Sequence, residues 1–419
     1  MSVPNPIVLL DARAKYVHPA FQMSRASDKW VLDAAGRMVT VPPNALGWEG
    51  NPALGGRWGY LSEPATTNLF TMSGDLTDDD WTTGNATIAV SSEPLPAPGA
   101  VMYKLAETSA TNYHRLNGTW HQLPTPQYAI CTWYMKPAER QYGAVRIHTT
   151  GSTTDVSYAI FNLLTGEVTR VVEFEGLSII DAASVHVGSG IWRCWMVIQN
   201  TSGTNQDVIF GVSTARDNNT VWYEGETGSG IYVGWPMASI GANARAPTSY
   251  IPTDVSTATR PADRLTIPDL TAQSWWRTEQ GALFANVYMN GWSRNGPIFY
   301  VPGVAVMRFN GAAPNTQFQG TVGAGSTQTV GWTSGGFALR ARQSIAVTWG
   351  EGGWQAAVNG ALVFGGDTVV GSVVGPLPLY LGHFPESWSD PLPAYFERAV
   401  YYPQRISNAD LQSLTAIQE

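Results

Sequence analysis

The segment from Ile231 to Ile267 constrains the fold of this chain more than any other stretch. It begins with apolar residues at alternate positions, Ile231, Val233 and Trp235, as in a half-buried β-strand. Three prolines that exclude a helix and favour extended backbone then follow, Pro247, Pro252 and Pro261. A second strand-like run, RLTI, comes next, and a proline-rich connection between two strands is stiff. The sequence therefore predicts two β-domains joined by a rigid linker at residues 251–262.

Length and composition favour several all-β domains. At 419 residues, the chain exceeds what one hydrophobic core usually serves, so we expect two or three domains. Charged residues make up 13% of the sequence, against roughly 25% in an average protein, while Gly, Pro and aromatic residues are abundant. This composition suits turn-rich β-structure. The net charge of −8 and the scattered lysines argue against direct nucleic-acid binding, which requires neutralised phosphates.

Short alternating segments separated by turn signals run through most of the chain. They predict one β-sandwich or jelly-roll domain at residues 67–250 and a second at residues 263–419. Residues 1–66 are predicted as an extended N-terminal region with a hairpin around the turn Asp33–Gly36. The one predicted helix has Ser407 as its N-cap and ends near Ile417. The predicted fold is thus all-β, with two β-sandwich domains and one short C-terminal helix.

Several motifs resemble those of a known group of proteins. The run APTSYIPTDVSTATRPAD, Ala246 to Asp263, resembles the domain junction of tailed-bacteriophage head-spike and tail-fibre proteins. Three further motifs match the same pattern, namely SRAS at Ser24–Ser27, the turn at Asp33–Gly36 and EPATTNLF at Glu63–Phe70. The motifs WYMKPAE, FNLLTGEV and GSGIWRCWMV resemble a carbohydrate-binding-module-like jelly roll. IAVTWGEGGWQAAVNG, LYLGHF and FERAVYYPQRISNADLQSLT resemble a concanavalin A-like or laminin-G-like domain.

The resemblance implies a virion structural protein, a head spike, head fibre or tail fibre, made in the host cytoplasm. It would adhere to host-surface polysaccharide by multivalent, non-catalytic binding. Its N-terminal region would attach to other virion proteins of the capsid, portal or tail, and it would form a homo-oligomer, with a trimer favoured by analogy with phage fibres. A capsid decoration protein without glycan binding and a polysaccharide depolymerase are the alternatives. We expect no membrane insertion, because no signal peptide and no apolar run of roughly 18 residues is visible.

Tryptophans in polar loops are the best candidates for sugar binding. Sugars stack on aromatic faces while neighbouring polar groups bond to their hydroxyls. The loop tryptophans are Trp48, Trp58, Trp81, Trp120, Trp292 and Trp388. The candidate carbohydrate-binding residues are Arg115, Asn117, Trp120, His121, Asn290, Trp292, Arg294 and Trp388. Packing at a subunit contact is the alternative role, since such contacts also favour Trp, Tyr and Arg.

Other groups of reactive residues give weaker signals. Glu173 and Glu175 share one strand face, and Glu224 and Glu226 share a loop, but a solvated surface or a turn explains each pair as well. We predict no catalytic residue and no cofactor. Three consecutive acids, Asp78, Asp79 and Asp80, are candidates for a structural calcium ion. The two cysteines, Cys131 and Cys194, lie in apolar strands and are interpreted as buried thiols, with a disulfide between them as the alternative.

Overall fold

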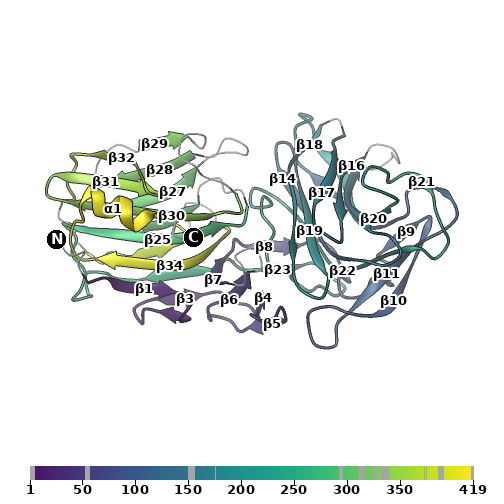
Figure 1. The fold of residues 1–419 in the computed structure, drawn as a ribbon, viewed down its shortest axis with the longest axis horizontal. Helices are drawn as coiled ribbons and strands as arrows, with labels where there is room; N and C mark the ends of the chain where they lie inside the picture. The colour runs from purple at the N-terminus through teal and green to yellow at the C-terminus, as the bar shows by residue number, and fades with distance from the viewer. Residues whose placement is uncertain are drawn as a thin grey trace. The chain divides into compact units, whose positions relative to one another are not determined.

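The computed structural model describes the chain except for residues 1–4, 52–56, 150–155, 175, 292–295, 311–316, 324–327, 332–338, 372, 374, 386–390 and 417–419. The chain forms two compact units, built almost entirely of β-strands (Figure 1). The C-terminal unit comprises Met1–Asp28, Val41–Ala65 and Pro261–Glu419, and the central unit comprises Lys29–Thr40 and Thr66–Arg260. The predicted all-β class is confirmed. Residues 1–66, which the sequence sets apart as one region, are divided between the two units.

The C-terminal unit contains two sheets. Its strands are β1 (Ile7–Asp11), β2 (Tyr16–Val17), β3 (Gln22–Ser24), β6 (Trp48–Asn51), β7 (Arg57–Ser62), β24 (Arg264–Ile267), β25 (Gly281–Met289), β26 (Pro297–Val301), β27 (Ala305–Asn310), β28 (Gln317–Val322), β29 (Gln328–Gly331), β30 (Arg342–Gly350), β31 (Gly353–Val358), β32 (Ala361–Gly366), β33 (Leu379–Leu381) and β34 (Ala394–Tyr402). One sheet has the order β2-β1-β34-β25-β30-β31-β32, with β7 also on β34 and β6 on β7. The other has the order β29-β28-β27-β26-β33-β24-β3.

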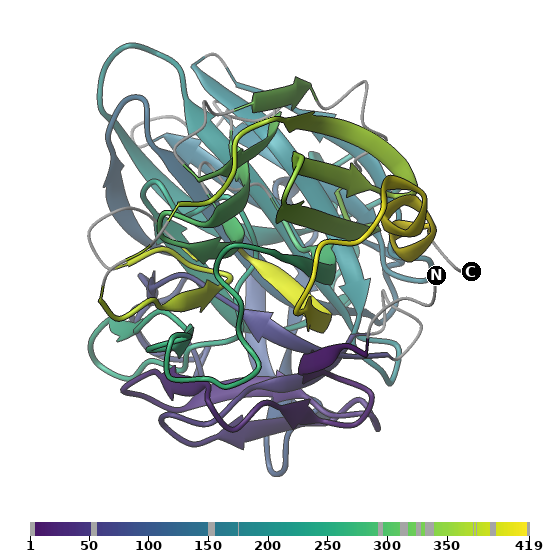
Figure 2. The same cartoon turned by 90° about the vertical axis from the view of Figure 1, so that its left-hand side faces the viewer.

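The helix α1 (Asn408–Thr415), the yellow coil in Figure 2, helps to bury the second face of β25. Alternate residues of a strand point to opposite faces. Leu283 and Val287 therefore enter the core between the sheets, whereas Phe284 packs in a second apolar cluster with Leu411 of α1. The Ser407 side chain accepts a hydrogen bond from the backbone N–H of Asp410, at 3.1 Å. This confirms the predicted N-cap and the predicted helix.

A buried ion pair brings three of the sequence motifs together in the C-terminal unit. Arg25 of SRAS donates from Nη1 to Oδ1 of Asp263 in TRPAD, at 2.9 Å, and both side chains are fully buried. The other oxygen of Asp263 accepts from the backbone N–H of Glu63 in EPATTNLF, at 3.1 Å. Arg25 also donates to the backbone oxygens of Ser27 and Pro42, both at 2.9 Å. The charges are thus paired and hydrogen-bonded, which a buried ion pair requires to be tolerated.

The central unit is a second sandwich. Its strands are β4 (Lys29–Leu32), β5 (Met38–Val41), β8 (Thr66–Asn68), β9 (Thr82–Gly84), β10 (Ala86–Pro94), β11 (Val101–Glu107), β12 (Thr111–Asn112), β13 (Arg115–Leu123), β14 (Tyr128–Pro137), β15 (Tyr142–Thr149), β16 (Val156–Asn162), β17 (Val168–Val172), β18 (Leu177–His186), β19 (Trp192–Asn200), β20 (Gln206–Ala215), β21 (Tyr223–Glu224), β22 (Gly230–Ile240) and β23 (Ala258–Arg260). The two main sheets have the orders β10-β11-β22-β14-β19-β18 and β17-β16-β15-β20-β13-β9. Three two-stranded sheets accompany them, β12-β21, β23-β8 and β4-β5, and the last confirms the predicted hairpin.

Both cysteines face the core between the two main sheets. Cys131 on β14 and Cys194 on β19 are completely buried and are not bonded to each other. Burial raises the pKa of both thiols, which keeps them protonated and unreactive. The prediction of buried free thiols is confirmed.

Trp235 lies on the opposite face of its sheet from Ile231 and Val233, although the alternating pattern of the sequence predicts one face for all three. Ile231 and Val233 on β22 enter the core between the sheets, but Trp235 joins a cluster on the opposite face. Trp235 has a positive φ of 43°, and the pairing of β14 with β22 shifts register between Thr132 and Tyr134. This irregularity reverses the side-chain direction. Trp235 instead stacks on Tyr250 of TSYIPT, with ring centroids 4.9 Å apart.

One buried side-chain amide holds the path of β22. Asn68, fully buried on β8, donates to the backbone oxygens of Pro236 and Ile251 at 3.2 and 2.9 Å. Its Oδ1 accepts from the backbone N–H groups of Phe70 and Ala238, both at 3.2 Å. Asn68 therefore holds β22 and the segment after it in place.

Within the described part of the chain, no helix has the length and apolarity that a membrane crossing requires.

Replacing Arg25 should destabilise the C-terminal unit strongly. Arg25→Met leaves Asp263 buried without its main cationic partner, so we expect a loss of about 3–5 kcal/mol in the free energy of unfolding. Urea unfolding followed by tryptophan fluorescence measures the change. Arg37→Ala is the control, because that side chain is 71% exposed in its pair with Asp33 and should cost less than about 1 kcal/mol. Equal effects of the two substitutions would contradict the assignment.

His383 should make the C-terminal unit sensitive to acid. Burial lowers the pKa of His383 from 6.5 to about 4. The unfolded chain therefore takes up this proton near pH 6.5 and the native chain only near pH 4. The contribution of His383 to stability is full above pH 6.5 and falls away between pH 6.5 and 4, by up to about 3 kcal/mol. Unfolding measured across this window should show a flatter pH dependence for His383→Gln, and identical slopes would refute the prediction.

Candidate functional site

The candidate site lies on the outer face of the sheet β17-β16-β15-β20-β13-β9 in the central unit. On β15, Val145 and Ile147 point into the core, so Ala144, Arg146 and His148 point to the opposite face. Pairing registers align Asn117, Gly211, Arg146 and Tyr158 in one row across β13, β20, β15 and β16. We call this outer surface, with Arg115, Asn117, Trp120 and Arg146, the Arg146 face.

Arg146 is a buried cation without a counter-ion among the described residues. Its side chain is 1% exposed, and its Nε and Nη1 atoms have no hydrogen-bond partner. The guanidinium carbon lies 4.8 Å from the ring centroid of Tyr113, a cation–π contact. Burial, and then the neighbouring charge of Arg115, lowers the pKa of Arg146 to about 9, so the group stays charged at neutral pH. A buried charge without an anion is costly, so a ligand that supplied an anion here would be favoured.

Two predicted site residues, Arg115 and Asn117, lie beside Arg146. A side chain on Gly84 would stand 2.7 Å from the guanidinium carbon of Arg115, and one on Gly211 would stand 2.4 Å from Oδ1 of Asn117. The two glycines thus leave room for the polar side chains to lie against the sheet. Nε of Arg115 and Oδ1 of Asn117 are buried, and no residue that the structure describes bonds to either atom. The Nδ2 group of Asn117 lies 3.4 Å from Nε2 of His148, which positions the amide.

The remaining predicted residues of β13 separate onto two faces. The pairing of β13 with β20 skips two residues between Asn117 and Trp120, so that Trp120 lies opposite Ile209. Trp120 is therefore on the Arg146 face, where its side chain is 61% exposed. His121 lies opposite Val208 and contacts Phe210 of the core, with ring centroids 6.0 Å apart. The structure thus brings together Arg115, Asn117 and Trp120, and it places His121 on the other side of the sheet.

The other predicted residues do not gather into a site. Trp81 is 7% exposed and packs on Phe70 and Trp133, at 4.8 and 5.6 Å between ring centroids, so it is a core residue and not a surface platform. Asn290 lies in the C-terminal unit, where its backbone N–H donates to Pro393. Its predicted neighbours Trp292 and Arg294, and also Trp388, lie outside the described residues.

The candidate calcium ligands form an ordinary turn. Oδ1 of Asp78 accepts from the backbone N–H of Asp80, at 3.0 Å. The backbone N–H of Trp81 donates to the Asp78 carbonyl. Among the described residues, no three His, Cys, Asp or Glu side chains gather as metal ligands, Asp78, Asp79 and Asp80 included.

The described carboxylates of the predicted acidic pairs are either engaged locally or solvent-exposed. Glu173 accepts from the backbone N–H of Ile179 at 2.7 Å, and Glu175 lies outside the described residues. Glu226 pairs with Arg140 at 3.7 Å, and Glu224 is exposed.

Another acid, Glu107, holds the loop that contains Glu224 and Glu226. Arg140 donates to both of its carboxylate oxygens, at 2.8 and 2.7 Å, and Tyr223 also bonds to it. Burial alone would raise the pKa of Glu107, but these hydrogen bonds and that from the backbone N–H of Glu226 lower it. An acid held ionised in this way is suited to fixing a loop and not to donating a proton.

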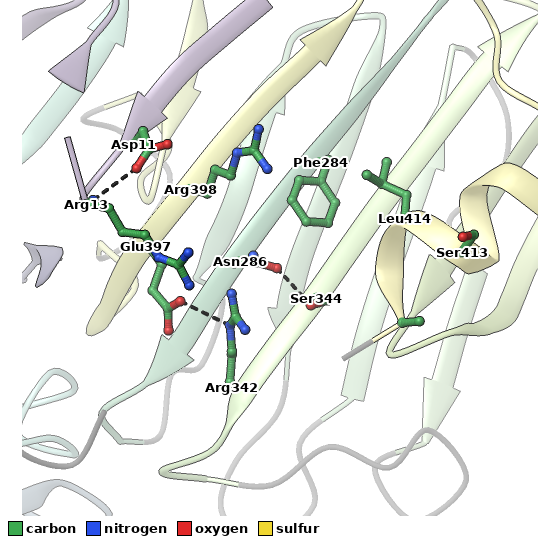
Figure 3. A pocket seen from close by; sticks show the side chains of 11 residues that line it. Asp11, Arg13, Phe284, Asn286, Arg342, Ser344, Glu397, Arg398, Ser413 and Leu414 are labelled. Atoms are coloured by element: carbon green, nitrogen blue, oxygen red, sulfur yellow. Dashed lines mark hydrogen bonds and ion pairs between the residues drawn. The ribbon is translucent and has the colours of Figure 1, made fainter. Parts of the chain in front are cut away.

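A second polar surface lies in the C-terminal unit, beside α1 (Figure 3). This cavity of about 460 Å³ is lined by charged and polar residues from β1, β25, β30 and β34. Several of its groups bond to one another. Arg342 pairs with Glu397 at 3.0 Å, and Ser344 donates to Asn286 at 2.8 Å. Since these groups already satisfy one another in part, this cavity is a weaker candidate than the Arg146 face.

Sequence reasoning missed Arg146, although a signal for it existed. In GAVRIHTT, the alternation of Val145 and Ile147 places Arg146 on the face away from the core. An arginine there is normally a solvated residue, and nothing local shows that Tyr113 covers it. Only the three-dimensional structure reveals that Arg146 is buried and that no described residue supplies an anion to it.

Comparisons with known proteins do not assign a family. No protein-family profile and no curated protein matches the chain significantly. Among solved structures, domain 4 of a GH43 extracellular arabinanase from Geobacillus stearothermophilus, in complex with arabinotriose, is similar at 15% identity, covering 40% of this chain and 80% of that one, with a TM-score of 0.29. The CBM40 of a Ruminococcus gnavus sialidase, bound to α2,3-sialyllactose, matches at 15% identity, covering 36% and 91%, with a TM-score of 0.29.

Domains LG4-5 of the mouse laminin α1 chain match at 11% identity, covering 71% of this chain and 90% of that one, with a TM-score of 0.24. At such scores the similarities carry no argument about what this chain binds. The case for a function therefore depends on the residues of the Arg146 face.

A side chain at Gly211 should disturb the packing of the Arg146 face. In Gly211→Ala the new Cβ would meet Oδ1 of Asn117 at 2.4 Å and the Leu116 carbonyl oxygen at 2.6 Å. We expect a loss of about 1–3 kcal/mol in the free energy of unfolding, because the strands must move apart. Gly74→Ala is the control, since nothing lies within 4 Å of its Cβ position. Chemical denaturation of both variants measures the difference, and a neutral Gly211→Ala would show that the row is not tightly packed.

Proposed function

We propose that the protein is a non-catalytic adhesion protein that binds polysaccharide through the Arg146 face. The observation that carries this proposal is the position of Trp120. A large aromatic ring, 61% exposed, lies on the same sheet face as Arg115 and Asn117, whose buried Nε and Oδ1 atoms have no hydrogen-bond partner in the described part of the chain. An aromatic platform with adjacent hydrogen-bonding groups is suited to a sugar ring, which has an apolar face and a polar edge.

The wider proposal is that the protein belongs to the particle of a tailed phage and adheres to the host surface. The motifs around Arg25, Glu63 and Asp263 support it, because they resemble head-spike and tail-fibre proteins and meet at one buried ion pair. We further propose attachment to other virion proteins through residues 1–66 and assembly as a homo-oligomer, with a trimer favoured. Repeated weak sites on one particle would then bind with high avidity.

Removing the aromatic platform should weaken adsorption. We expect Trp120→Ala to reduce the affinity of one site for host polysaccharide by about tenfold, a loss of about 1.4 kcal/mol. Surface plasmon resonance on immobilised polysaccharide measures the change. Leu164→Ala is the matched control, because Leu164 is 62% exposed in the same unit at the turn between β16 and β17.

The outcomes separate the candidate functions. Binding by the parent protein that is weakened by Trp120→Ala and unchanged by Leu164→Ala supports adhesion through this face. New reducing ends released from the polysaccharide would favour a depolymerase instead. An absence of binding to whole host cells and to their polysaccharide would contradict the proposal and favour a decoration protein.

A further inference from the structure

We propose that the Arg146 face selects an anionic sugar, in which a carboxylate lies against Arg115 above the buried charge of Arg146. The inference deepens the proposed function and rests on it. It concerns the substrate class, because a surface that binds sugar through Trp120 alone would accept neutral and acidic polysaccharides alike.

The Arg146 face carries an excess of positive charge. One row of paired residues across the sheet contains Asn117, Gly211, Arg146 and Tyr158, and the next row contains Arg115, Ser213, Ala144, Ile160 and Arg170. These rows hold three arginines and no acidic residue. The whole chain carries a net charge of −8, so this concentration of positive charge opposes the average of the protein.

The three arginines of these rows differ in their hydrogen-bond partners. Arg170 donates to the backbone oxygen of Asn219 at 2.8 Å. Nε and Nη1 of Arg146 and Nε of Arg115 are buried without a partner among the described residues. By contrast, the buried Arg25 and the partly buried Arg140 each have a carboxylate at hydrogen-bond distance. A ligand carboxylate would supply the missing anion, and guanidinium groups bind carboxylates strongly.

Arg115, Asn117 and Trp120 lie in an order on β13 that suits an acidic sugar. Arg115 is less deeply buried than Arg146, so it is the group that the ligand reaches, while Arg146 raises the electrostatic potential from beneath. Oδ1 of Asn117 is buried against Gly211 without a hydrogen-bond partner among the described residues, so a hydroxyl that displaced the cover over it would supply one. Trp120 lies at the next outward position of β13 and offers an apolar surface. A carboxylate, a hydroxyl and a ring face are what a hexuronic acid presents together.

The test compares polysaccharides with their own carboxyl-reduced forms. A panel of acidic bacterial polysaccharides is immobilised beside the reduced, neutral polymers and a sulfated neutral polymer, and the full chain is applied to all. We expect at least about tenfold tighter binding to a carboxylated polymer than to its reduced form, with the preference weakened by salt. Arg146→Met should remove the preference, whereas Trp120→Ala should weaken binding to both forms and leave the preference in place.

Stability provides an independent readout for Arg146. If the charge serves a ligand, Arg146→Met removes an unpaired buried cation and should keep or raise the melting temperature. Arg115→Gln is the second variant, and it should reduce the same preference if Arg146→Met does not fold. Equal binding to native and reduced polymers would overturn the inference while leaving polysaccharide adhesion intact. Preference for the sulfated polymer over the carboxylated ones would overturn the choice of a carboxylate, and no binding to any polymer would overturn the proposed function itself.

Discussion

The buried ion pair between Arg25 and Asp263 is the interaction on which the organisation of the C-terminal unit depends. It joins residues that are 238 positions apart, and the Asp263 carboxylate also holds the backbone of Glu63. In the same unit, the N-terminal strands β1 and β7 pair with β34 near the other end of the chain, and β3 pairs with β24, which directly follows Asp263. Most of the residues that look like a separate leading region in the sequence thus belong to the two sheets of this unit.

The fold could be predicted because most of it follows from local patterns. Alternating apolar residues and turn signals indicate strands, and Ser407 marks the start of the helix through a cap that depends on neighbouring residues alone. Two tryptophans show the limit. Trp235 changes face because of an irregularity in strand pairing, and Trp81 is buried by contacts with Phe70 and Trp133. Neither register shifts nor contacts between distant strands are visible in a local pattern.

The candidate site was predictable in part for the same reason. Arg115, Asn117 and Trp120 stand close together on one strand, so sequence proximity identifies them. His121 does not join them, because adjacent residues of a strand point to opposite faces. Arg146 comes from another strand and reaches the site only through the pairing of β15 with β20 across Gly211. Long-range register is therefore what the sequence could not provide.

Two buried arginines, Arg25 and Arg146, have opposite roles in this protein. Arg25 is surrounded by acceptors and stabilises the fold, whereas Arg146 has no anion among the described residues and gives its face a charge that a ligand can use. The most direct measurement is a crystal structure of the full chain with an acidic oligosaccharide bound. The account predicts a sugar ring against Trp120 and its carboxylate against Arg115. An oligosaccharide that instead occupies the cavity beside α1, with the Arg146 face empty, would contradict the central claim.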